Sequence, residues 1–134
     1  MSGLVLKLAP KERVLINGAV IENGDKRAKI SIKTPNANIL RLRDAIHPDQ
    51  ANTPVSRICY ICQLVLTGDA DEMEARKQIS LGIEQLSRAL DDRDSRQILD
   101  ASTHAILQGN YYHALKQLRL LLPREARLLA SRLS

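Results

Sequence analysis

Seven basic residues near the start of the chain have the types and spacing best suited to binding chemistry. Lys29 and Lys33 alternate with apolar residues, so a strand would place them on one face. Arg41 and Arg43 alternate with leucines in the same way, and we expect both to face solvent. Such a face could hold a phosphate backbone, although Lys and Arg also commonly cover the solvent side of strands. The candidate binding residues are Arg13, Lys26, Arg27, Lys29, Lys33, Arg41 and Arg43.

The pair Cys59 and Cys62 could suggest redox or metal chemistry. The two residues lie three apart in an apolar stretch that reads as helix, so they share one face. A zinc site would need two more suitably spaced ligands, and the three histidines are scattered. We therefore expect both thiols to pack in the core and predict neither a metal nor a cofactor. The absence of a phosphate-binding loop, a dinucleotide motif or a Ser-His-Asp arrangement predicts a protein that is not an enzyme.

Composition narrows the classes of partner. The chain has 134 residues, a formal net charge of +5, three tyrosines and neither phenylalanine nor tryptophan. RNA-recognition sheets that stack bases on several aromatic rings are therefore excluded, and RNA binding would depend mainly on Arg, Lys and backbone groups. Without an 18-residue apolar run or the features of a signal peptide, we expect a cytoplasmic protein with no membrane association.

Residues 1–46 are predicted to form a basic β-sheet region. Runs at 4–8, 13–21, 27–34 and 39–43 are typical of strands. Asn23-Gly24 predicts a hairpin turn before the third run, and Asn17-Gly18 could form a bulge or turn within the second. Residues 1–43 carry nine Lys and Arg against three acidic residues, a net of +6, so the remainder carries −1. The strand region is therefore the cationic part of the chain.

Residues 47–134 are predicted to be α-helical. Thr53 followed by Pro54 predicts one helix start, Asp69 or Asp71 a second, and Asn110 another. We expect helices from Pro54 to near Gly68, up to Leu90, over 95–108 and over 110–122. Pro123 should end or kink the last one before 124–133 resumes it. The predicted fold class is α+β: a small N-terminal antiparallel β-sheet or barrel, then a bundle of about four helices, together one compact unit.

Four segments in this order resemble the FlbT family, the flagellar biosynthesis repressors of alphaproteobacteria. They are ERVLINGAVIENGD at 12–25, ILRLRD at 39–44, ANTPVSRICYICQ at 51–63 and GNYYHALKQLRLLLPREARLL at 109–129. The resemblance implies association with the 5′ untranslated region of flagellin mRNA and promotion of its decay or a block of translation. Because some relatives act positively on flagellin, the direction of regulation is not implied. Family members more often have Asp where this chain has Asn110, and both residues cap helices.

The segment from Ala28 to Ile46 is also similar to the C-terminal strand region of the CsrA translational regulators. Those proteins present an arginine to RNA at the end of that strand, and this likeness points to Arg43. The resemblances imply flagellin mRNA as partner, with flagellin or another flagellar regulator and a homo-oligomer as further possibilities. The alternative function is a protein-interaction adaptor that binds flagellin or an assembly factor through the helical region. It is motivated by leucines such as Leu120 and Leu121, which lie off the main apolar face.

Overall fold

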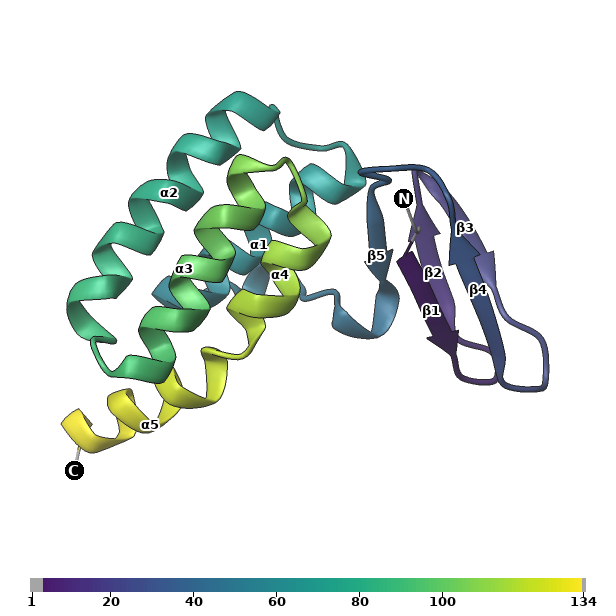
Figure 1. Ribbon diagram of the computed structural model, residues 1–134. Helices are drawn as coiled ribbons and strands as arrows, with labels where there is room; N and C mark the ends of the chain where they lie inside the picture. Colours follow the sequence, from purple (N-terminus) through teal and green to yellow (C-terminus); the bar gives the residue numbers. More distant parts are fainter. Residues whose placement is uncertain (1–3, 134) are drawn as a thin grey trace.

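The helices form a bundle on one side of the molecule, and the strands form two antiparallel sheets on the other side (Figure 1). The computed structural model describes residues 4–133, and side chains up to residue 132. β1 (Leu4–Leu8) pairs with β4 (Ala28–Ile32) in one sheet. The second sheet has the order β3 (Ala19–Glu22), β2 (Arg13–Ile16), β5 (Ile39–Arg41). The predicted α+β class is confirmed, and the described strands form two open sheets instead of one.

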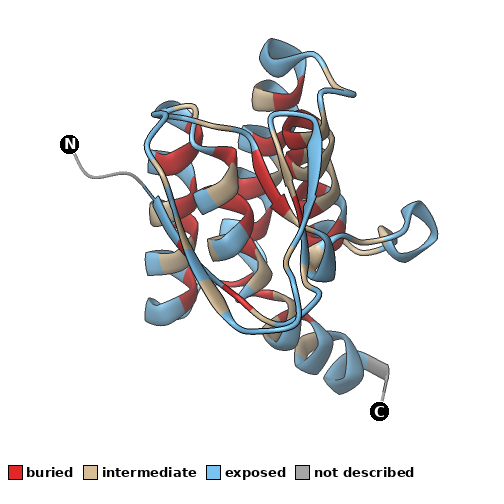
Figure 2. Cartoon of the chain, turned by 90° about the vertical axis from the view of Figure 1, so that its right-hand side faces the viewer, coloured by how far each residue is buried: buried red, intermediate tan, exposed pale blue. Residues whose placement is uncertain are grey.

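The alternation of apolar residues determines how the layers pack. Leu6 and Leu8 of β1 meet Val14 of β2 and Ile39 of β5 in a small core between the two sheets, which we call the strand core. Leu40, the next residue of β5, points the other way and belongs to the larger core among the helices, the helical core. Because β5 is buried on both faces, it joins the two regions. Most of the strand ribbon in front in Figure 2 is exposed or half-buried.

The two Asn-Gly pairs have different roles from those predicted. Asn17 and Gly18 both have positive φ angles, of 47° and 86°, and make the tight turn between β2 and β3. The hairpin predicted at Asn23-Gly24 is wrong, because β3 and β4 pair with different strands. The Asn23 side-chain amide instead donates to the carbonyl oxygens of Ala9 and Lys26, at 2.8 and 2.9 Å, and so holds this loop together.

The helices begin at most of the predicted residues. Thr53, Asp71 and Asn110 each accept a hydrogen bond from a backbone N–H one turn later, which confirms these caps. The helices are α1 (Pro54–Thr67), α2 (Glu72–Ala89), α3 (Arg93–Leu107), α4 (Tyr111–Arg119) and α5 (Leu122–Leu133). α4 ends three residues earlier than predicted, and Pro123 lies in the first turn of α5, where a missing N–H does no harm.

α1 packs against α2 and α4, while α3 packs against α4 and α2. α5 is fastened to this bundle by Glu125, whose carboxylate is 6% exposed and accepts a 2.9 Å hydrogen bond from the Val55 N–H at the start of α1. Of the two leucines that lay off the main apolar face, Leu121 is fully buried and Leu120 is exposed. Within residues 4–133, no helix has the length and apolar character needed to cross a membrane.

Candidate nucleic-acid interface

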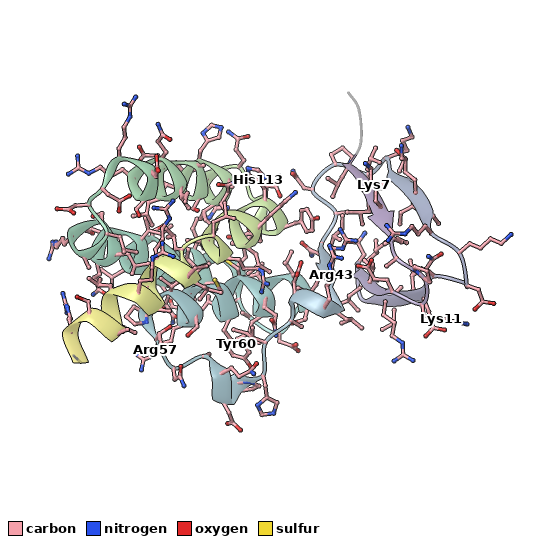
Figure 3. The ribbon with its side chains drawn as sticks, turned by 90° about the horizontal axis from the view of Figure 1, so that it is seen from below. Lys7, Lys11, Arg43, Arg57, Tyr60 and His113 are labelled. Carbon is pink, nitrogen blue, oxygen red and sulfur yellow. The ribbon has the colours of Figure 1, made fainter. Side chains whose placement is uncertain are left out.

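Four cations surround one shallow cavity on the strand region. The cavity has a volume of about 360 Å³, and we call it the strand cavity. Its lining consists of Lys7, Leu8, Ala9, Arg27, Ala28, Lys29 and Arg43, with no acidic side chain among them. Figure 3 places Lys7 over the strands and Arg43 at the point where strands and helices meet. This arrangement of positive charge around apolar ground suits a flexible polyanion.

The register of the first sheet brings two of these cations face to face. Lys7 of β1 lies directly opposite Lys29 of β4 in the antiparallel ladder, and both are exposed. Like charges in this position repel each other and slightly destabilise the sheet. A bound phosphate would remove this repulsion and release counterions as it did so. The ladder therefore favours an anion above this face.

An ion pair with little exposed side-chain surface contacts two of the residues that line the cavity, Lys7 and Arg43. The Arg41 guanidinium donates to both carboxylate oxygens of Glu12, at 2.7 and 2.9 Å, and also to the carbonyl oxygen of Lys7. The two side chains are only 11% and 6% exposed. The hydrogen bonds from Arg41 lower the pKa of Glu12 to about 2, against the opposing effect of burial. The pair ties β5 to β1 and to the segment before β2.

The expectation that Arg41 faces solvent is therefore wrong. β5 ends at Arg41, and residues Leu42–Asp44 turn into the short 3-10 helix η1. Since alternation stops there, Arg41 and Arg43 do not share one face of a strand. Arg43 is the exposed member, with 58% of its side chain accessible and its Nε 3.8 Å from the Glu12 carboxylate. Its guanidinium is available to a ligand, whereas that of Arg41 is occupied.

The structure separates the other predicted site residues. β4 and β5 lie in different sheets, so only Arg27, Lys29 and Arg43 of the predicted set converge on the strand cavity. Arg13 pairs with Glu22 at 2.9 Å, which lowers the pKa of that carboxyl. Lys26 is exposed in the loop before β4, and Lys33 lines a different cavity.

Sequence reasoning missed Lys7. Lys7 alternates with the buried residues Leu6 and Leu8 and lies exposed on the outer face of β1. Its membership of the cluster depends on the pairing of β1 with β4, two strands separated by two others along the chain. The sequence could have identified Lys7 as a member of the cluster only if the pairing of β1 with β4 had also been predicted.

The cysteines and histidines lie away from this cluster. Cys59 and Cys62 are both buried in α1, which confirms the prediction that they pack in the core. Burial raises the pKa of the Cys59 thiol to about 12 and also raises that of Cys62, so neither forms a thiolate at neutral pH. His104 and His113 are exposed on either side of the turn between α3 and α4.

Comparison with known proteins identifies the family of this chain. The family model described as flagellar protein FlbT matches residues 4–129. The chain belongs to the FlbT family. This confirms the resemblance in the four segments quoted above, whereas the local likeness to CsrA stays a prediction. No solved structure gives a significant match.

Curated relatives of the FlbT family cover nearly the whole chain. A probable flagellum biosynthesis repressor protein FlbT of Rhodopseudomonas palustris (strain TIE-1) is 38% identical over 128 residues, which are 95% of this chain and 98% of the relative. The probable repressor FlbT 1 of Bradyrhizobium diazoefficiens is 33% identical and covers 93% of this chain and 84% of its own. The flagellum biosynthesis repressor FlbT of Caulobacter vibrioides (strain ATCC 19089) is 26% identical, covering 91% and 86%.

Proposed function

We propose that this member of the FlbT family is a cytoplasmic, non-catalytic regulator that binds the 5′ untranslated region of flagellin mRNA. Relatives named as repressors of flagellum biosynthesis support a regulatory role in flagellar expression. The observation that carries the RNA-binding step is the strand cavity, with four cations and no acidic side chain in its lining. Binding there would promote decay of the message by cellular nucleases or block its translation.

The chemistry of the strand cavity favours phosphate contacts. Lys7 and Lys29 lie on the paired strands β1 and β4, Arg27 directly precedes β4, and Arg43 lies in η1, so the fold brings these four charges to one cavity. Arginine can contact phosphate oxygens and base edges through paired N–H groups, whereas lysine acts as a point charge. Unpaired loops of RNA offer both kinds of acceptor to such a surface.

The test is fluorescence anisotropy of the purified protein with a flagellin 5′ leader RNA and a scrambled RNA of equal length. Four phosphate contacts at about 0.7 each predict a slope of log affinity against log salt near −3. Tighter binding of the leader with that slope supports the proposal. Weak and equal binding of both RNAs would contradict it and would favour the adaptor function through a protein partner.

A further inference from the structure

Two more cavities continue from the strand cavity along α4. The first, which we call the joint cleft, has about 130 Å³ and is lined by Leu40, Arg41, Arg43, Asp44, Tyr112, Leu115, Lys116 and Arg119. The second, the apolar cavity, has about 360 Å³ and lies between the strands and the start of α4. Arg43 lines both the strand cavity and the joint cleft, while Tyr112 and Lys116 line both the joint cleft and the apolar cavity. Neighbouring cavities thus share lining residues where the two regions meet, and we call the three cavities together the groove.

The joint cleft has an excess of positive charge, which comes from Arg43 and Lys116 because Arg41 is paired with Glu12 and Arg119 with Asp44. Four of its lining residues are basic and only Asp44 is acidic. Arg119 is held in place by Asp44, with 3.1 Å from Nη1 to the carbonyl oxygen and 3.6 Å from Nη2 to the carboxylate. Lys116 is exposed, and no acidic group among residues 4–133 lies within ion-pair distance of it. Arg43 and Lys116 are thus the cations that a compact anion would reach first.

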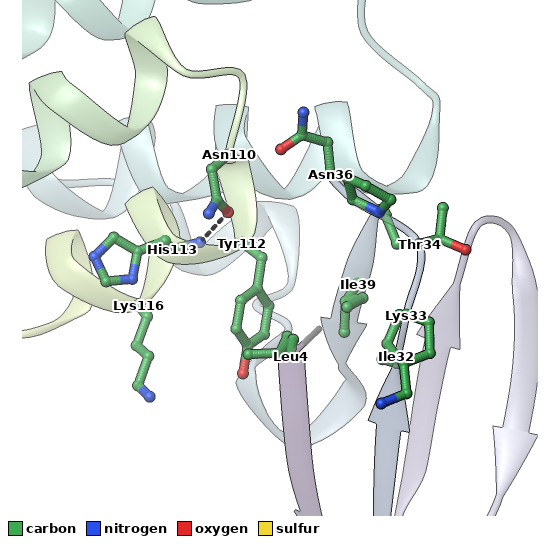
Figure 4. Close-up of a pocket in the computed structure, with 12 residues that line it drawn as sticks. Leu4, Ile32, Lys33, Thr34, Asn36, Ile39, Asn110, Tyr112, His113 and Lys116 are labelled. Carbon is green, nitrogen blue, oxygen red and sulfur yellow. Dashed lines mark hydrogen bonds between the residues drawn. The ribbon is translucent and has the colours of Figure 1, made fainter. Parts of the chain in front are cut away.

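The apolar cavity is suited to the ring of an unpaired base. Leu4, Ile32 and Ile39 form an apolar wall, and the ring of Tyr112 extends from α4 toward them (Figure 4). Tyr112 packs against both the strand core and the helical core, so its ring is held in one position. Polar groups on Thr34, Asn36, His113 and Lys116 lie around the rim and could meet the edge of a base. Stacking on a fixed aromatic ring is the usual way to hold such a base.

We infer that the groove holds one unpaired RNA nucleotide, with its phosphate in the joint cleft at Arg43, Lys116 and Arg119 and its base in the apolar cavity beside Tyr112. This rests on the proposed function and extends it, because it gives α4 a direct part in RNA binding. It also adds one aromatic contact to a protein whose sequence indicated binding by basic and backbone groups. A paired base inside a duplex could not enter the cavity, so the groove selects single-stranded RNA.

The test compares two probes: a labelled oligouridylate of ten nucleotides and an abasic ribose-phosphate chain of equal length. Lys116→Ala removes one phosphate contact, which should weaken binding of both probes about fivefold at 0.1 M salt and reduce the salt slope by about 0.7. Tyr112→Leu removes the ring but keeps apolar volume, so it should weaken only the oligouridylate. Lys77→Ala, an exposed lysine on α2 with the same charge change, is the matched control and should change neither.

Equal binding of the two probes by the wild-type protein would overturn the base site, even if Tyr112→Leu failed to fold. Unchanged affinity of Lys116→Ala would overturn the phosphate site. Polyglutamate that competes as well as oligouridylate would also overturn the inference, because the groove would then take an acidic peptide. Binding of the flagellin leader by the wild-type protein tests the proposed function separately, so the groove can fail while the function stands.

Discussion

The strand region and the helical region differ in how they use their residues. Among residues 4–132, the strand core contains four buried residues, Leu6, Leu8, Val14 and Ile39, whereas the helical core contains twenty. Charge is distributed in the opposite way, since residues 1–43 carry a net +6 and the remainder −1. The helices therefore supply most of the buried apolar surface, and the strands supply most of the excess positive charge.

This difference indicates how a small sheet can carry a repulsive face. Lys7 and Lys29 oppose each other on two strands that share little core. Contacts between the two regions offset the destabilising repulsion between these lysines. Leu40 of β5 packs in the helical core, and Tyr112 of α4 contacts both cores. Attachment to a large core allows the strand region to keep its cations where RNA could use them. The predictions below test this division.

The largest expected effect is on the helical core. Leu118→Ala removes a fully buried side chain and should lower the free energy of unfolding by about 2–5 kcal/mol, because it leaves a cavity. Leu6→Ala, in the strand core, should cause a loss of unfolding free energy near the lower end of that range. The small strand core can relax into the space that the side chain leaves. Denaturant titration measures both. A greater loss for Leu6→Ala would reverse the assignment of the stabilising core.

Arg41→Ala should lower the free energy of unfolding by about 3 kcal/mol, because it leaves the covered Glu12 carboxylate with only the Ala9 N–H and the more distant Arg43. A loss of this size would show that Arg41 stabilises the fold and is not a surface residue available to RNA. Arg13→Ala is the control, since its pair with Glu22 is exposed and should contribute no measurable stability. Equal stabilities of the two variants in thermal unfolding would show that the Glu12–Arg41 pair does not hold the strand region together.

Acid should act on the same pair. The pKa of Glu12 is about 2 in the folded protein against an ordinary value of 4.5, so its contribution to stability is complete above about pH 5 and declines as pH falls toward 2. The slope of unfolding free energy against pH should therefore be steeper between pH 5 and 2 in the wild-type protein than in Arg41→Ala. Parallel curves would contradict the low pKa of Glu12.

Glu125→Ala should lower the free energy of unfolding by about 2 kcal/mol, because the buried Val55 N–H at the start of α1 loses its acceptor. Glu125→Gln keeps an acceptor and should lose less. RNA affinity of either folded variant should match that of the wild-type protein, because α5 lies away from the groove. Reduced affinity at full folding would assign α5 a part in binding.

Local sequence signals predicted much of the fold. Thr53, Asp71 and Asn110 cap helices as expected, because a cap depends on residues within one turn. The two Asn-Gly pairs were locally equivalent. Asn17-Gly18 closes the local hairpin of β2 and β3, whereas Asn23-Gly24 does not form a hairpin because β4 pairs with the distant strand β1. Prediction of the fold was therefore limited mainly by long-range pairing.

The candidate site was predicted in part for the same reason. Alternation correctly placed Lys29 on the outer face of its strand. It failed at Arg41, because the last strand ends there and a covered carboxylate, Glu12, lies 29 residues away in the sequence. The cluster of Lys7 with Lys29 required the register of a sheet that the sequence did not reveal.

The most direct test of the central claim compares the salt dependence of leader binding in two double variants. Lys29→Ala with Arg43→Ala removes two cations from the strand cavity, and Lys77→Ala with Arg96→Ala removes two exposed cations from the helical region. The first should reduce the magnitude of the salt slope by about 1.4, at about 0.7 for each contact, and the second should leave it unchanged. Equal slopes for both variants would contradict binding of RNA at the strand cavity.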